Sequence, residues 1–223
     1  VRSVMNRAPD ELTELMNSFN KMAQALEERN AMNVQVLEEK EALLRELRKR
    51  VSDNLQLISS LVSLQIDHTS AEETKRSLMT AHARVMAMSL VYETLFKFSD
   101  VEQVQFKRYA AGLGDFLVSL YADIGSSISV QVGGMDVSVG IDLALPLGLI
   151  LNELVSNSIL HAFPPGRKGN ISIVFSRVSA SHLQMEIIDD GIGFEKDIRE
   201  SETLGYEMIE GLVHQVRGEL VVD

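Results

Sequence analysis

Three short segments in the second half of the chain carry the residue types that could do chemistry. In the first, Glu153 and Asn157 are four residues apart in a stretch with helical character, so a helix would place both on one face. A carboxylate and an amide oxygen stacked in this way suit Mg²⁺, which keeps several waters and bridges to phosphate groups. The same spacing fits a solvated polar stripe on an amphipathic helix, and this segment alone leaves both interpretations open.

The second segment brings a carboxylate into a glycine turn. An apolar strand delivers Asp189 to a turn that contains Gly191 and Gly193. Glycines allow a backbone to approach a flat ligand closely, and a partly buried carboxylate can accept a hydrogen bond from an exocyclic amine. Such turns are common where strands end, so the segment alone predicts a turn rather than a site.

The third segment passes through Gly205 into a helix. Helix N-termini present free N–H groups to anions, which suits a polyphosphate. By itself the segment is a helix start, and only the order and spacing of the three segments together point further.

The first hundred residues must be mostly helical, because neither Pro nor Gly occurs from Asp10 to about Phe98. Apolar residues recur there in steps of three and four, as in a heptad seam. A polar break at residues 67–70 predicts a helical hairpin. The three apolar series are Leu12, Leu15, Phe19, Met22 and Leu26; Leu44, Leu47, Val51, Leu55, Ile58 and Val62; and Leu78, Ala81, Val85, Met88, Tyr92 and Leu95.

A hairpin of two helices buries only one apolar stripe per helix, so its stability would be marginal if it stood alone. The pattern therefore favours dimerisation into a four-helix bundle, with the upstream helix entering as a parallel coiled coil. The alternative is a monomeric hairpin folded onto the C-terminal half.

After Phe98 short β-like runs alternate with helical ones, which predicts helices on one side of a mixed sheet, an α/β sandwich. The sheet is expected to be incomplete, because the last strand opens at Glu219 near the end of the chain. The expected helices cover residues 104–121, 142–162 and 205–216, and the expected strands cover residues 127–132, 138–141, 170–176 and 183–188.

Composition excludes several classes of function. The formal net charge of −11 argues against a nucleic-acid partner, and the absence of cysteine excludes disulfides, thiolate metal sites and thiol nucleophiles. The longest apolar run, Ala144–Leu151, is too short to span a bilayer, and no signal peptide is visible. The chain starts at Val1, and we interpret it as a fragment of a larger protein.

Taken together, the three segments resemble the N, G1 and G2 boxes of the nucleotide-binding fold shared by histidine kinases, gyrase and Hsp90-type (GHKL) proteins. The run from Ala144 to Asn157, followed by His161-Ala162-Phe163-Pro164, is very similar to the HisKA_2/HWE class of sensor histidine kinases. Residues 46–56 resemble the first helix of the dimerisation and phosphotransfer (DHp) hairpin of that class, and residues 84–96 resemble its second helix. Asp10–Leu12 with Phe19–Met22 is similar to the second helix of a HAMP domain.

The resemblance implies ATP and Mg²⁺ as cofactors. Asp189 would bind the adenine amine, Asn157 would ligate Mg²⁺, and Glu153 would organise the metal or a water. The nucleotide-binding set implied by the resemblance is Glu153, Asn157, His161, Asp189, Gly191, Gly193 and Gly205, with His161 a pocket-wall residue.

Two departures bear on the phosphate groups. Leu160 stands where many relatives carry a lysine near the phosphates. Arg167 and Lys168 either supply this charge or belong to a solvated loop.

The phosphoacceptor is the main departure from the family pattern. The paired histidines of its hairpin motif are replaced by Arg48 and Lys49, which are protonated at neutral pH and cannot accept a phosphoryl group. Autophosphorylation of the usual kind is therefore not expected. His68 and His82 are the only histidines in the sequence of the expected hairpin. The rival interpretation is a working kinase that uses one of them as its phosphoacceptor.

The resemblance implies another activity of histidine kinases that does not need the acceptor histidine, which is dephosphorylation of their response regulator. An amide about one turn after the acceptor position can orient a water, and a nearby ammonium can stabilise negative charge. Asn54, Asp53 and Lys49 are the candidate catalytic residues, and the alternative is that the first two are only exposed helix residues. The other function that does not need an acceptor histidine is that of a dimeric scaffold, which sequesters a response regulator and catalyses nothing.

The expected organisation is therefore a HAMP-like helix and coiled-coil linker in residues 1–40, a DHp-like dimerisation hairpin in residues 41–100, and a GHKL α/β sandwich in residues 101–223. The expected setting is the cytoplasmic portion of a bacterial inner-membrane sensor that acts on a response regulator receiver domain.

Overall fold

A computed structural model describes residues 8–97, 103–122, 127–164, 166–179, 182–193 and 204–222. The chain divides into two compact units, one ending at Arg48 and the other starting at Lys49. The expected boundary near residue 100 does not coincide with this division, and the three expected segments stay a prediction.

Helix α1 runs from Ala8 to His68 and confirms the long helix expected from the absence of Pro and Gly. In the N-terminal unit the first apolar series faces solvent: Leu15 and Phe19 are 67% and 63% exposed. A helix with such a stripe gains most of its stability when a partner covers the stripe, as in a coiled coil.

The second unit begins with the expected hairpin. Residues 49–68 of α1 are followed, after a short turn, by α2, Glu72–Lys97, which carries two glutamates in its first turn where the helix dipole favours them. The two helices are joined by a buried hydrogen-bonding contact of 2.7 Å between Ser59 Oγ and His82 Nε2. On α1 the side turned inward carries Ser52, Ser59 and Ile66, which are seven residues apart.

The sheet of the second unit has three strands: β2 (Ile128–Gly134), β4 (Gly169–Arg177) and β5 (Leu183–Asp189), in the order β2-β4-β5. β4 is parallel to β2 and antiparallel to β5, so the sheet is mixed, as expected. Alternate residues of β4 (Ile171, Ile173 and Phe175) are buried, which is the pattern of a strand with one face on a core.

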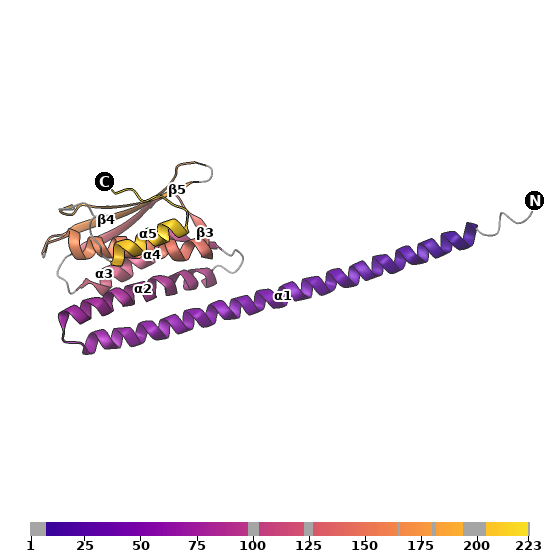
Figure 1. Cartoon of the computed structure of the whole chain (residues 1–223), viewed down its shortest axis with the longest axis horizontal. Coiled ribbons are helices and arrows are strands. Elements are labelled where there is room, and N and C mark those ends of the chain that lie inside the picture. Colours follow the sequence, from indigo (N-terminus) through magenta and orange to yellow (C-terminus); the bar gives the residue numbers. More distant parts are fainter. Residues whose placement is uncertain are drawn as a thin grey trace, which may run out of the picture. The chain divides into compact units, whose positions relative to one another are not determined.

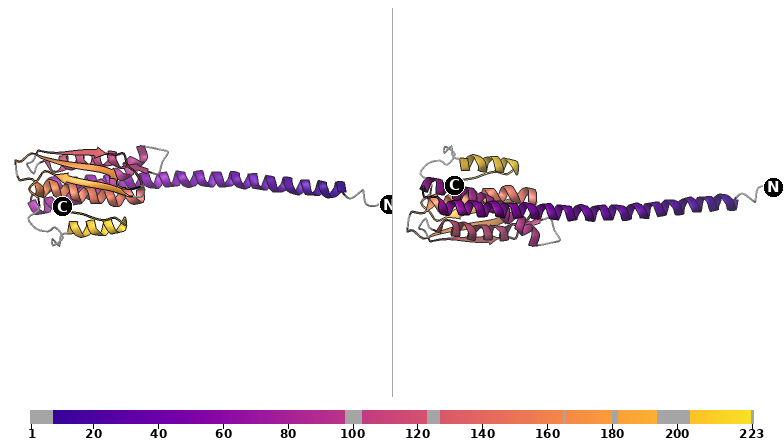
Figure 2. Two further views of the ribbon diagram at one scale, coloured as in Figure 1. Left: turned by 90° about the horizontal axis from the view of Figure 1, so that it is seen from above. Right: turned by 90° about the horizontal axis from the view of Figure 1, so that it is seen from below.

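Three helices accompany this sheet: α3 (Phe106–Leu120), α4 (Ile141–Asn157) and α5 (Leu204–Gln215). Helices α3 and α4 lie on one side of the strands (Figure 1), and the view from above in Figure 2 shows the strands over them. Helix α2 packs against α3 and α4, and α5 packs against α4. The expected α/β sandwich is therefore present, with the second hairpin helix as an additional layer.

The structure differs from the expected elements in three places. A short antiparallel pair, β1 (Gln103–Gln105) with β3 (Ser138–Gly140), precedes α3 and α4; β1 was not expected. The expected helix over residues 142–162 ends at Asn157 and continues as a π-helical turn, Ser158–Ala162. The strand expected from Glu219 is not formed in residues 219–222, which pair with no other strand of the described chain.

Among the described helices, one segment, Ile141–Ala162, is long and apolar enough to cross a membrane. More than half of it is buried inside the protein, because it is the central helix of the α/β layer. Its apolar composition is explained by this core position.

Candidate functional site

The candidate nucleotide site lies where α4 ends and β5 ends. Asn157 is the last residue of α4 and is half-buried, and Ser158 opens the π-helical turn. Single π turns inside α-helices occur frequently at functional sites, because the extra residue redirects the side chains that follow.

Asp189, the last residue of β5, is fixed by two hydrogen bonds. Its Oδ2 accepts a hydrogen bond from Ser158 Oγ at 2.8 Å, and its Oδ1 accepts one from the backbone N–H of Gly191 at 3.0 Å. The carboxylate is half-buried and keeps lone pairs that can accept a further hydrogen bond from an amine. Sequence reasoning missed Ser158, and the only signal was a hydroxyl directly after Asn157.

The glycine turn packs against the end of the π-helical segment. Ile192 N–H donates to the carbonyl oxygen of Ala162 at 2.9 Å. A Cβ on Gly191 would lie 2.5 Å from that oxygen, and Gly193 has φ +71°, so both positions require glycine. The turn thereby ties β5 to the C-terminal end of the helix that carries Asn157.

Asp190, next to Asp189, has a structural role. Its Oδ1 accepts a hydrogen bond from the backbone N–H of Asn170 at 2.8 Å, and its Oδ2 accepts one from Asn170 Nδ2 at 3.1 Å. These two hydrogen bonds lower the pKa of the Asp190 carboxyl group. Arg167 donates to the carbonyl oxygen of Asp190. Arg167 therefore contacts the turn, and both Arg167 and Lys168 are exposed.

Glu153 is almost fully buried, and the chain already binds both of its carboxylate oxygens. Arg84 on α2 donates from Nε to Oε1 at 2.9 Å and from Nη2 to Oε2 at 2.8 Å. Asn152 Nδ2 donates to Oε1 at 3.0 Å. A Cβ on Gly205 would lie 3.3 Å from Oε2, so α5 begins beside this carboxylate. The role expected for Glu153 at the metal stays a prediction.

The donor set fits a metal that is held mainly by phosphate. The described residues contain no group of three or more His, Asp or Glu side chains that could hold a metal ion by themselves. Mg²⁺ commonly takes one or two protein ligands and completes its shell with phosphate oxygens and waters, so Asn157 would supply a protein oxygen to such a metal. Leu160 is half-buried and His161 is exposed on the same turn.

The candidate catalytic residues of the hairpin are all exposed. Lys49, Asp53 and Asn54 lie on the outer side of α1 next to buried Ser52. Of the two alternative phosphoacceptors, His82 is 8% exposed between α1, α2 and α3, whereas His68 is exposed at the end of α1. Burial makes His82 a poor candidate for phosphoryl transfer in this conformation.

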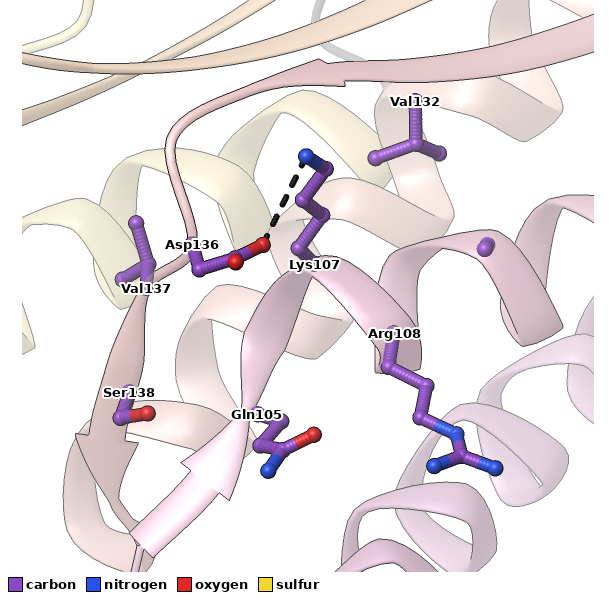
Figure 3. Close-up of a pocket in the computed structure, with 8 residues that line it drawn as sticks. Gln105, Lys107, Arg108, Val132, Asp136, Val137 and Ser138 are labelled. Carbon is purple, nitrogen blue, oxygen red and sulfur yellow. Dashed lines mark ion pairs between the residues drawn. The ribbon is translucent and has the colours of Figure 1, made fainter.

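A separate cavity of about 390 Å³ lies between β1, β3 and α3 (Figure 3). Lys107 points toward Asp136 there, with 3.5 Å between Nζ and Oδ1, and it also donates to the carbonyl oxygen of Gly134 at 2.8 Å. None of the predicted site residues lines this cavity.

Comparison with known proteins identifies the families that this chain resembles. Residues 46–121 match the HisKA_2 histidine kinase family, and residues 142–222 match the family of histidine kinase-, DNA gyrase B-, and HSP90-like ATPases. The sensor histidine kinase PdtaS of Mycobacterium tuberculosis is 33% identical over 181 residues, which are 78% of this chain and 35% of that protein. This chain is a homologue of the sensor histidine kinases.

Further relatives of this kinase homologue give the same result. The blue-light-activated histidine kinase 2 of Erythrobacter litoralis is 25% identical over 193 residues, 80% of this chain and 52% of that protein. The solved histidine kinase domain of the Erythrobacter litoralis EL346 blue-light activated histidine kinase has a TM-score of 0.54 at 22% identity, covering 79% of this chain and 84% of that one. The fold is therefore that of a histidine kinase domain. The homologue spans about a third of the length of its mycobacterial relatives.

Proposed function

We propose that this histidine kinase homologue binds ATP with Mg²⁺ at the junction of α4, the π-helical turn and β5. The observation that carries the proposal is Asp189, which is oriented by Ser158 and the Gly191 N–H and still has free lone pairs. A carboxylate held in this way can accept the exocyclic amine of adenine. Asn157 would ligate Mg²⁺, Gly191 and Gly193 would bring the backbone to the base, and Gly205 with His161 would border the phosphates.

We propose that the output is dephosphorylation of a response regulator rather than autophosphorylation. Arg48 and Lys49 occupy the acceptor positions, and neither side chain offers a neutral nitrogen near pH 7. In the proposed step Asn54, supported by Asp53, orients a water that attacks the phosphorus of an aspartyl phosphate. The P–O bond to the aspartate breaks, releasing inorganic phosphate and a free carboxylate, while Lys49 offsets the developing negative charge. All three residues are exposed in the single chain. Asn54 lies seven residues before Leu61 and so on the same face of α1 as the apolar stripe, and the proposed step therefore requires the dimer to leave this end of the stripe open to a receiver domain.

We propose a homodimer formed through the hairpin. The part of α1 in the second unit leaves Leu57, Ile58, Leu61 and Leu64 largely exposed. A stripe of large apolar side chains on one helix is usually covered by another copy or partner. In a four-helix bundle of two hairpins, two-fold symmetry lets each copy cover the stripe of the other. The HAMP-like start of α1 would connect this dimer to a membrane-bound sensor, with the described part in the cytoplasm.

Three measurements on the purified chain test these proposals. We expect ATP binding with Mg²⁺ by calorimetry, with affinity reduced at least tenfold in Asp189→Asn. Incubation with γ-labelled ATP should leave no acid-labile label on the protein; label would show that a histidine such as His68 accepts phosphate.

The lifetime of a phosphorylated receiver domain should shorten in the presence of the chain. Asn54→Ala should abolish this effect, while Ser60→Ala, at an exposed position on the same helix, should not. An unchanged lifetime with wild-type protein would leave the sequestering scaffold as the output.

A further inference from the structure

A partly buried ion pair in the second unit joins the hairpin to helix α4. Arg84 and Glu153 are 69 residues apart in sequence and form a two-pronged ion pair, with side chains 25% and 5% exposed. Paired hydrogen bonds between a guanidinium and a carboxylate fix both distance and orientation. The bond to Glu153 also raises the pKa of Arg84, so the arginine stays charged.

The packing of α2 around Arg84 favours an ion pair that forms and separates together with the docking of this helix. Helix α2 approaches α3 and α4 through small side chains, because Ala83 and Ala87 are fully buried on it. Such close packing leaves little room for the pair to rearrange while α2 stays in place. Displacement of α2 would therefore carry Arg84 away from Glu153.

The position of Glu153 links this contact to the proposed nucleotide site. Glu153 is one helical turn before Asn157, and its Oε2 lies beside the position of a Cβ on Gly205 at the start of α5. It therefore stands between the two residues expected to border Mg²⁺ and the phosphates. With Arg84 and Asn152 bound to its oxygens, it has little capacity left for a metal-bound water.

We propose that Arg84 is a positioning residue that withholds Glu153 from the nucleotide-bound metal while α2 is docked on α4. The inference rests on the proposed ATP site and adds a regulatory coupling to it. Because coupling between two equilibria is reciprocal, Mg²⁺–ATP that recruits Glu153 also weakens the docking of α2. Movement of the hairpin is thereby converted into a change of metal-dependent nucleotide affinity.

The test is the affinity of the full chain for ATP, measured by calorimetry with Mg²⁺ and again with EDTA. Arg84→Met removes the charge and keeps the length of the side chain. We expect it to tighten binding about fivefold or more with Mg²⁺ and less than twofold with EDTA. Arg76→Met, at an exposed position two turns earlier on α2, is the matched control and should change neither value.

A second variant separates coupling from loss of folding. The double variant Arg84→Met with Glu153→Gln removes both charges, so neither is left unpaired. In the Glu153→Gln background, adding Arg84→Met should therefore have no effect on the Mg²⁺ dependence. A purely structural role would instead weaken binding equally with Mg²⁺ and with EDTA, and that result would overturn the proposal. A Mg²⁺-specific gain that persists in the Glu153→Gln background would overturn it as well.

The outcomes also separate this inference from the function on which it rests. If the wild type binds Mg²⁺–ATP and Arg84→Met binds it identically, only the coupling is refuted. If only Arg84→Met binds, the docked state blocks the site and the coupling is supported. If no variant binds ATP, the proposed nucleotide site fails and the coupling fails with it.

Discussion

The phenolic hydroxyl of Tyr109 on α3 donates a hydrogen bond to the carbonyl oxygen of Ala87 on α2, at 3.1 Å. Tyr109 is fully buried, and burial raises its pKa, so the phenol remains a donor throughout the physiological range. Gly148 on α4 lies directly beside this hydroxyl. One side chain thus links the hairpin helix α2 to α3 and α4.

The contact predicts opposite effects of two glycine-to-alanine substitutions. A Cβ on Gly148 would lie closer to the Tyr109 hydroxyl than real Cβ contacts allow, whereas a Cβ on Gly112 in α3 would meet no atom within 4 Å. Gly148→Ala should therefore lower the free energy of unfolding by about 1–3 kcal/mol, the usual cost of overpacking. Gly112→Ala should raise it by about 0.5–1 kcal/mol through helix propensity. Urea unfolding measures both, and equal effects would refute the close packing of Gly148 against Tyr109.

A second prediction concerns the serine that orients Asp189. Ser158→Ala removes one of the two hydrogen bonds to this carboxylate, which remains held by the Gly191 N–H. A hydrogen bond to a charged group contributes about 1.5–3 kcal/mol, and part of it is recovered by solvent. We expect affinity for ATP to fall roughly three- to tenfold, as measured by calorimetry. Ser129→Ala, which removes a hydroxyl bonded to Asn170, is the control and should leave affinity unchanged.

A third prediction concerns pH and the buried imidazole of His82. Burial lowers its pKa, and in the described structure its Nδ1 has no hydrogen-bond partner, while the ring packs edge-on against Phe116. The unfolded chain takes up a proton near the ordinary histidine pKa of about 6.5, before the folded protein does. The unfolded state therefore binds more protons below this pH, and stability falls as pH falls through it.

The expected loss from His82 is at most about 1.4 kcal/mol for each pH unit below 6.5. Urea unfolding at several pH values between 7.5 and 5.5 measures it. His82→Gln can keep a hydrogen bond to Ser59 without titrating, and it should flatten the profile relative to the wild type. Profiles with the same slope in both proteins would contradict the prediction.

The sequence predicts the order of helices and strands well, because most elements are long and periodic. It does not predict which face of α2 is buried. The expected seam passes through Ala81, Val85 and Met88, whereas the buried residues facing the α/β layer are Ala83, Ala87 and Val91. Periodicity is dominated by large apolar side chains, while close contact between helix backbones selects small ones.

The site shows the same limit. The turn glycines and Asp189 can be identified from the sequence, because glycines directly after a strand indicate a tight turn that other residues do not adopt easily. The partners of the polar residues are not visible: nothing in the sequence pairs Arg84 with Glu153 or Ser158 with Asp189. The expected last strand at Glu219 is a different case, because residues 219–222 pair with no strand of the described chain although β2 and β5 each have an unpaired side.

The last prediction concerns assembly through α1. Leu61 is 54% exposed in the single chain and lies between Leu57 and Leu64 on the stripe that faces away from α2. If a second copy covers this stripe, a carboxylate at its centre would be desolvated without a partner, which costs far more than the lost apolar contact. Leu61→Glu should therefore convert a dimer into a monomer at micromolar concentrations in sedimentation equilibrium.

An exposed position away from the stripe supplies the control for this prediction. Gln56 is exposed, and Gln56→Glu introduces the same charge on the same helix five residues before Leu61. It should leave the dimer intact, because a side chain five residues away points to another side of the helix and its carboxylate stays in solvent. A dimer that survives Leu61→Glu, or one that is lost equally in both variants, would show that the apolar stripe of α1 is not the interface.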